Sequence, residues 1–204
     1  MRLFRTIASA QGGRVFANMG AAFGVNDELI AQVVRYFLPP LIKSISRHTE
    51  TSQGLLYFLE FLGGRRNDRY LADPGIFGHP QVEAEGHAIL ATLFPNPAHL
   101  RKIIENRAKV LPLPPQMLER MLPYVAIFAL GAIENKTREP LRKILQRISH
   151  GWVDDTAMSN PYRALAGEIR RRRLTTRGRD QDRRTGLSGM IGALFARADT
   201  QRAA

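Results

Sequence analysis

The sequence predicts an all-α protein: a compact bundle of about six to eight helices, two of them with mid-helix prolines, and a flexible basic C-terminal extension. Three observations predict it. Apolar residues recur at helical intervals through residues 1–150, Gly and Pro separate the apolar segments, and alternating β-branched runs with hairpin turns do not appear. A domain of about 150 residues buries roughly two thirds of its unfolded surface, so a substantial core is possible.

Two short helices are expected before residue 24. Apolar residues at 3–7 start an amphipathic turn, the Gly-Gly pair at 12–13 interrupts it, and helical spacing resumes over 15–23. Gly24 can adopt the left-handed conformation that ends a helix, and Asn26 can cap the next one. That next helix has a wide apolar face from 29 to 45.

Four further helices follow. Thr51 or Ser52 is expected to cap a helix that ends at 63–64. Residues 65–80 lack an apolar period, which indicates a long ordered loop with packing or binding value. Prolines then open helices at 80–94, 97–110 and 114–135, because the missing N–H of proline needs no partner in the first turn.

Two of these helices carry a proline within an apolar face. An offset of 84 residues places Leu38-Pro39 on Leu122-Pro123 and also aligns their apolar neighbours. A mid-helix proline bends the axis and costs about 3 kcal/mol. The match suggests two equivalent kinked helices from a duplicated unit, and coincidence between two leucine-rich helices is the alternative.

The composition of the sequence changes near residue 150. We expect a helical domain at 1–150 and, at 151–204, a basic and largely disordered extension with one or two short helices. A helix is expected from Pro161, capped by Ser159 or Asn160, and disorder from 170 to 184, where charge outweighs apolar surface. Apolar residues at 187–195 return to helical spacing.

Several short motifs, taken in order, resemble the YidB-like bacterial family, an all-helical family of unknown function. They are AQGGRVFANMGAAFGV, LLYFLEFLGG, RYLADPGIFGHP, GHAILATLF and MLPYVAIFALGAI, and the likeness covers about residues 1–135. The resemblance implies a helical bundle and brings no catalytic residues. The arginine-rich segment after residue 168 departs from the family pattern.

Composition excludes several classes of protein. The chain has no cysteine, which excludes disulfides, thiol catalysis and cysteine-based metal centres. The longest apolar run, 121–133, has thirteen residues, short of the roughly 20 that span a bilayer. Arg5 interrupts an N-terminal apolar stretch too short for an export signal. We therefore expect a cytoplasmic protein without a transmembrane segment.

Catalytic patterns are weak. His79, Glu83 and His87 are spaced four apart and form a weak metal-site candidate, but no fourth ligand is evident and Pro80 places His79 at the extreme start of its helix. Phosphate-binding loops, a dinucleotide fingerprint and a nucleophile elbow are missing from the sequence. We expect no enzyme activity and no cofactor, with metal-dependent activity at this trio as the alternative.

The formal charge of +12 favours anionic partners. Arginine outnumbers lysine 25 to 5, which the base composition of a GC-rich genome would also produce. The candidate anion or nucleic-acid contacts are Arg170, Arg171, Arg172, Arg173, Arg177, Arg179, Arg183 and Arg184. Phosphate binding would be nonspecific, because the run itself holds no aromatic residue for base readout. An anionic membrane surface and a simple solubilising tail are the other interpretations of the run.

The sequence favours a non-catalytic helical protein-interaction or scaffold module that binds an unknown protein partner or itself. Exposed apolar helix faces or the loop from Arg69 to Pro80 would supply the contacts. A nonspecific nucleic-acid-associated protein is the alternative.

Overall fold

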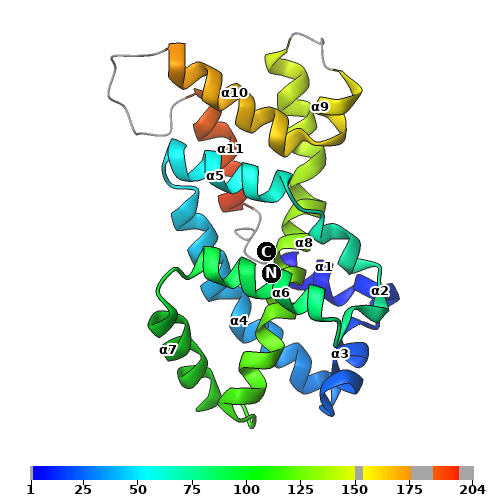
Figure 1. Ribbon diagram of the computed structural model, residues 1–204. Helices are drawn as coiled ribbons and strands as arrows, with labels where there is room; N and C mark the ends of the chain where they lie inside the picture. The colour runs from blue at the N-terminus through cyan, green and yellow to red at the C-terminus, as the bar shows by residue number, and fades with distance from the viewer. Residues whose placement is uncertain (1, 150–153, 176–185, 198–204) are drawn as a thin grey trace, which may run out of the picture. The chain divides into compact units, whose positions relative to one another are not determined.

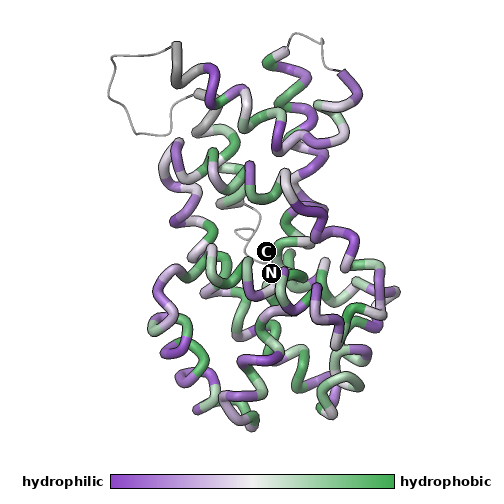
Figure 2. The backbone as a smooth tube through the Cα atoms, viewed as in Figure 1, coloured by the Kyte–Doolittle hydropathy of each residue, from purple (hydrophilic) through white to green (hydrophobic). Residues whose placement is uncertain are grey.

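The computed structural model describes residues 2–149, 154–175 and 186–197, and the regular elements in this part of the chain are all helical (Figure 1). This confirms the all-α prediction. Hydrophobic and hydrophilic residues alternate along the helices, as expected of helices that bury one face (Figure 2). In chain order the elements are α1 (Arg2–Ala8), α2 (Ala10–Gly13), α3 (Val15–Phe23), α4 (Asp27–His48), α5 (Ser52–Gly63), η1 (Asn67–Leu71), η2 (Pro74–Ile76), α6 (Pro80–Leu93), α7 (Pro97–Ala108), α8 (Pro115–Ile148), α9 (Asp155–Ser159), α10 (Pro161–Thr175) and α11 (Gly186–Arg197).

The chain divides into two units. Unit 1 comprises the residues up to Ser44 and Asn67–Ala132, and unit 2 comprises Ile45–Arg66 and the described residues from Ile133 onward. The division falls inside α4 and α8, so each of these helices contributes residues to both units. The units do not follow the boundary that we expected at residue 150, and independent folding of 1–150 stays a prediction.

The predicted helix ends are confirmed at several places. Gly24 ends α3 with a left-handed φ of 67°, and the Asn26 side chain accepts a hydrogen bond of 2.8 Å from the Leu29 N–H. Of the two caps considered for α5, Thr51 accepts from the Gly54 N–H at 3.0 Å. Asn160 caps α10 by accepting from the Arg163 N–H at 3.2 Å. Local sequence therefore determines these boundaries.

Helix α8 is longer than predicted. We expected it to end near residue 135, but it continues through Pro140 to Ile148. By length and composition α8 could cross a membrane. However, 78% of its 18-residue apolar segment is buried inside the protein, which is typical of a core helix. Its residues from Met121 to Ile133 are all buried.

Both predicted mid-helix prolines lie inside helices, Pro39 in α4 and Pro123 in α8. Their surroundings differ, because Pro39 is exposed whereas Pro123 is buried. A Cβ atom on Gly86 of α6 would lie 2.6 Å from the Pro123 carbonyl oxygen. Only glycine allows this close approach of α6 to α8 in unit 1. That the two proline-containing helices come from a duplicated unit stays a prediction.

The predicted ordered loop between α5 and α6 contains the two short 3₁₀ helices η1 and η2. It buries Asn67, Tyr70 and Ile76, which agrees with the expected packing value. Asn67 lies against α8, where a Cβ atom on Gly131 would lie 2.7 Å from its backbone oxygen. The segment is thus a packed part of unit 1.

Among the described residues, Gln11 is the one non-glycine residue with a positive φ, which is 54°. Its side chain is buried and holds two hydrogen bonds. The amide nitrogen donates to the Asp73 carbonyl at 2.6 Å, and the amide oxygen accepts from Asn18 at 2.8 Å. These bonds offset the cost of the left-handed conformation.

In unit 2, α10 lies along α5 (Figure 1). It buries one apolar face, formed by Tyr162, Leu165, Ala166 and Ile169. The helix extends to Thr175, so the predicted disorder is wrong for 170–175. Residues 176–185 lie outside the described chain. The predicted apolar cluster at 187–195 falls in α11, whose Phe195 packs edge-on against Phe58 of α5 at 5.3 Å.

Candidate functional site

The weak metal candidate is not assembled. His79 is the exposed N-cap residue of α6, and His87 of the same helix is also exposed. Glu83 accepts a hydrogen bond of 3.0 Å from the Tyr124 hydroxyl. Within the described residues, no group of three His, Cys, Asp or Glu side chains could hold a metal ion. The trio therefore has separate surroundings.

The loop from Arg69 to Pro80 is tied to α6 by a polar cluster. The Tyr70 hydroxyl donates to the Glu85 carboxylate at 3.0 Å, and the Arg69 guanidinium lies 3.2 Å from the same carboxylate. Burial raises the pKa of Tyr70 above its ordinary value, as it does for Tyr124. Both tyrosines therefore act as neutral hydrogen-bonding groups that fix the loop.

The predicted arginine contacts fall into three groups. Arg170 and Arg171 are exposed on α10, where Arg170 pairs with Glu60 of α5 and Arg171 lies 2.8 Å from Glu168. Arg172 and Arg173 belong to the same helix. The remaining four, Arg177, Arg179, Arg183 and Arg184, lie outside the described residues.

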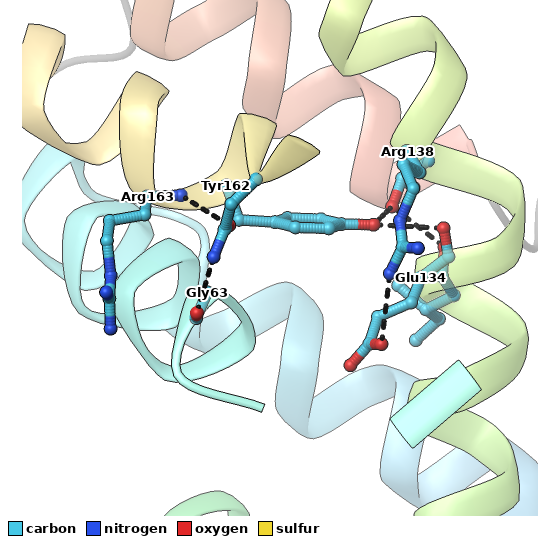
Figure 3. A network of polar contacts seen from close by, with 8 residues as sticks. Gly63, Glu134, Arg138, Tyr162 and Arg163 are labelled. Carbon is cyan, nitrogen blue, oxygen red and sulfur yellow. Dashed lines mark hydrogen bonds and ion pairs between the residues drawn. The ribbon is translucent and has the colours of Figure 1, made fainter. Parts of the chain in front are cut away.

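A buried polar network fixes α10 against α8 in unit 2 (Figure 3). The Tyr162 hydroxyl donates to the Glu134 backbone carbonyl at 2.9 Å and lies 3.0 Å from the Thr137 hydroxyl. Thr137 donates to the Ile133 carbonyl at 2.8 Å. Burial raises the pKa of Tyr162 well above its ordinary value, so the hydroxyl keeps its proton.

Two further contacts complete this network. The Glu134 side chain is buried, and its carboxylate lies 3.8 Å from the Arg138 guanidinium one turn later. The Asn160 amide donates to the Gly63 carbonyl at 2.8 Å, which joins the start of α10 to the end of α5. Sequence reasoning missed this network, because Glu134 and Tyr162 lie 28 residues apart. The available signal in the sequence was Glu134, a charged residue directly after the thirteen-residue apolar run 121–133.

Two aromatic residues of α5, Tyr57 and Phe61, lie within one helical turn of Glu60, which pairs with Arg170 of α10. Tyr57 is 62% exposed, and Glu60 and Phe61 share its helix face at spacings of three and four. The Arg65 guanidinium lies 4.6 Å from the centre of the Phe61 ring. The Glu60–Arg170 pair joins α10 to this helix, and Arg163 contacts Gly63 at its end.

We call this surface the α5–α10 face and define it by Tyr57, Phe61, Arg65, Arg163 and Arg170. Sequence reasoning missed it, because Tyr57 and Phe61 lie more than 100 positions before Arg163 and Arg170. The signal within α5 was an aromatic pair, Tyr57 and Phe61, at spacing four. Aromatic rings and guanidinium groups together can bind flat, anionic ligands.

Fold and site together define a class: an all-α protein with a cationic, aromatic surface and, in its described part, no metal cluster. The family model DUF937, described as a bacterial protein of unknown function, matches residues 5–136. The chain belongs to this family, which confirms the resemblance that the sequence motifs indicated. Neither a curated protein nor a solved structure matches the chain.

Proposed function

We propose that this protein is a non-catalytic interaction module that binds nucleic acid without sequence preference through helix α10. One observation carries the proposal: α10 buries its apolar face against α5 and turns Arg163, Arg170 and Arg171 to the solvent. A helix anchored in this way presents its cations on a fixed support. The sequence alone favoured a protein partner. We now favour nucleic acid as the partner because α10 places these arginines at the surface.

The charge distribution supports the proposal. Segments 45–66 and 133–202 contain 19 Lys and Arg against 10 Asp and Glu, whereas 1–44 and 67–132 contain 11 against 8. Each arginine that neutralises a phosphate releases counterions, so binding of this kind weakens steeply as salt rises. The exposed pairs of Arg170 and Arg171 with carboxylates are worth about 0–1 kcal/mol, so phosphates can replace those partners.

The test is a gel-shift titration of the full chain with duplex DNA at about 50 mM and about 200 mM salt. The variant Arg163→Ala/Arg170→Ala/Arg171→Ala is compared with Arg101→Ala/Lys102→Ala/Lys109→Ala, three exposed cations of unit 1. We expect the α10 variant to lose about tenfold in affinity and to show a shallower salt dependence. The control variant has the same net charge and should bind nearly as the unchanged protein does. Equal losses in both would contradict a role for α10.

A second candidate function is self-association through unit 1. The Arg107 guanidinium lies 5.6 Å from the centre of the Tyr36 ring, and Val110, one turn later, is 57% exposed. Tyr and Arg are the residue types that most often dominate interfaces. Light scattering over a range of protein concentrations tests it, with Val110→Glu as the variant. A strict monomer at high concentration contradicts this candidate and leaves nucleic-acid binding untouched.

A further inference from the structure

We infer that the α5–α10 face selects single-stranded nucleic acid, with Tyr57 as a stacking platform for a base and Arg163 and Arg170 on the phosphates. The inference rests on the proposed function and names the form of its ligand. It depends on a juxtaposition that the arginine run by itself does not contain: the exposed ring of Tyr57 lies one helical turn from Glu60, the carboxylate that pairs with Arg170 of the anchored basic helix.

Tyr57 supplies the first half of the site. Its side chain is 62% exposed although its neighbours Leu56 and Phe58 are buried, so the aromatic ring stands outside the core of unit 2. An exposed ring can stack on a base of any identity, because every base has a π-face. The bases of a duplex are already stacked on each other, and only a strand with free bases can use such a ring.

Phe61 and Arg65 supply a second platform one turn along α5. The half-buried Phe61 ring supports the Arg65 guanidinium at 4.6 Å, and a guanidinium plane held in this way also stacks on bases. Four helical residues separate Tyr57 from Phe61 by about 6 Å along the axis. This exceeds the spacing of about 3.4 Å between stacked bases in one strand of a duplex, so a flexible single strand fits both platforms better.

Helix α10 supplies the phosphate contacts. Arg163 and Arg170 lie seven residues apart, two turns or about 10 Å along one side of α10. Arg163 lies against Gly63, and Arg170 pairs with Glu60, the residue between the two platforms in the sequence of α5. The Glu60 carboxylate thus occupies the position that a phosphate would take. Because the Glu60–Arg170 pair is exposed, replacing the carboxylate by a phosphate costs little free energy.

The experiment measures fluorescence anisotropy of three labelled probes with the full chain: oligothymidylate and oligouridylate of about 20 nucleotides, and a duplex of equal length. Tyr57→Ala is the test variant, and Tyr36→Ala, which removes the partly exposed tyrosine of unit 1, is the matched control. Circular dichroism verifies that both variants keep their helices. We expect Tyr57→Ala to lose about tenfold in affinity for both single strands and less than twofold for the duplex. Tyr36→Ala should leave all three affinities unchanged.

The outcomes separate this inference from the proposed function. If single strands and duplex bind equally, depend on the α10 arginines and ignore Tyr57→Ala, the proposed function stands and the single-strand inference is wrong. If no probe binds, while vesicles containing anionic phosphatidylglycerol do, both are wrong and the face belongs to a membrane surface. A selective loss with oligouridylate alone assigns the site to RNA, and an equal loss with both strands assigns it to single strands generally.

Discussion

The two units use the same residue type in different ways. In unit 1, the guanidinium groups of four arginines lie over aromatic rings of the same unit: Arg35 over Phe4, Arg69 over Tyr70, Arg107 over Tyr36 and Arg120 over Phe23. In unit 2, Arg65 lies over Phe61 in the same way, but Arg170 and Arg171 of α10 reach carboxylates at the surface. The stacked arginines therefore cover apolar surface, whereas the exposed α10 arginines are those that we propose for an anionic ligand. Net charge alone does not separate these roles.

The units also treat their polar groups differently. The Tyr124 hydroxyl of unit 1 reaches a partly exposed carboxylate and the Gly78 N–H, at 3.0 and 2.8 Å. The Tyr162 hydroxyl of unit 2 ends on a backbone carbonyl and a threonine, all buried. Because buried polar groups cannot turn to water, the hydrogen bonds of Tyr162 should contribute more to stability than those of Tyr124.

The largest expected effect comes from Gly86→Ala in unit 1. The added Cβ would meet the Pro123 carbonyl at 2.6 Å, and neither helix backbone can yield without moving the packed core. We expect a loss of about 3 kcal/mol in the free energy of unfolding, measured by urea denaturation. Gly167→Ala in α10 is the control, because its Cβ meets nothing within 4 Å. It should stabilise by about 0.5–1 kcal/mol, and a similar loss in both would contradict the packing argument.

Tyr162→Phe comes next and concerns the network of unit 2. The substitution keeps the ring but removes the donor to the Glu134 carbonyl. We expect a loss of about 1–3 kcal/mol in the free energy of unfolding, because the Glu134 carbonyl and the Thr137 hydroxyl both lose a buried hydrogen-bonding contact. Tyr124→Phe is the matched variant in unit 1, and it should cost less because water can reach Glu83. Equal costs would remove this difference between the units.

Alkaline pH gives a related prediction. Unfolded Tyr162 ionises near its ordinary pKa of about 10, whereas burial raises the pKa of the folded residue. The unfolded state then binds fewer protons, so stability is complete below about pH 10 and falls as pH rises above it. Denaturation curves at about pH 8 and about pH 10.5 should show a smaller alkaline loss for Tyr162→Phe than for the unchanged protein. An identical loss would show that Tyr162 does not contribute to it.

Arg35→Ala tests the role of stacked arginines in unit 1. The Arg35 guanidinium lies 4.9 Å from the centre of the Phe4 ring. We expect a loss of about 0.5–1 kcal/mol in thermal or chemical denaturation, and no change in nucleic-acid affinity. A drop in affinity as large as that of an α10 arginine variant would contradict the division of roles between stacked arginines and the arginines of α10.

Glu60→Gln should have the smallest effect on stability. The pair with Arg170 is exposed, so its loss should change the free energy of unfolding by less than about 0.5 kcal/mol. Removal of the carboxylate also removes a competitor for phosphate, and affinity for single strands should rise by about two- to fivefold. Glu139→Gln, an exposed carboxylate paired with Arg142 in the same unit, is the control. Weaker binding by Glu60→Gln would contradict the proposed position of the phosphate.

The features that sequence predicts well here are local. Gly24, Asn26 and Pro80 mark helix ends through their own backbone or side-chain chemistry, and the structure confirms each of them. The prediction of disorder failed at 170–175, because α10 is supported by contacts with α5 that no local pattern reveals. The α5–α10 face could not be predicted for the same reason, since Glu60 and Arg170 lie 110 residues apart.

The left-handed turn at Gln11 has a consequence for the chemical ageing of the protein. The amide nitrogen donates to the Asp73 carbonyl, so hydrolysis of that amide to a carboxylate would set an anionic oxygen against a carbonyl oxygen. The remaining contact with Asn18 could not hold a strained backbone against this repulsion. Deamidation at this one buried glutamine would thus release α2 from the η1–η2 segment.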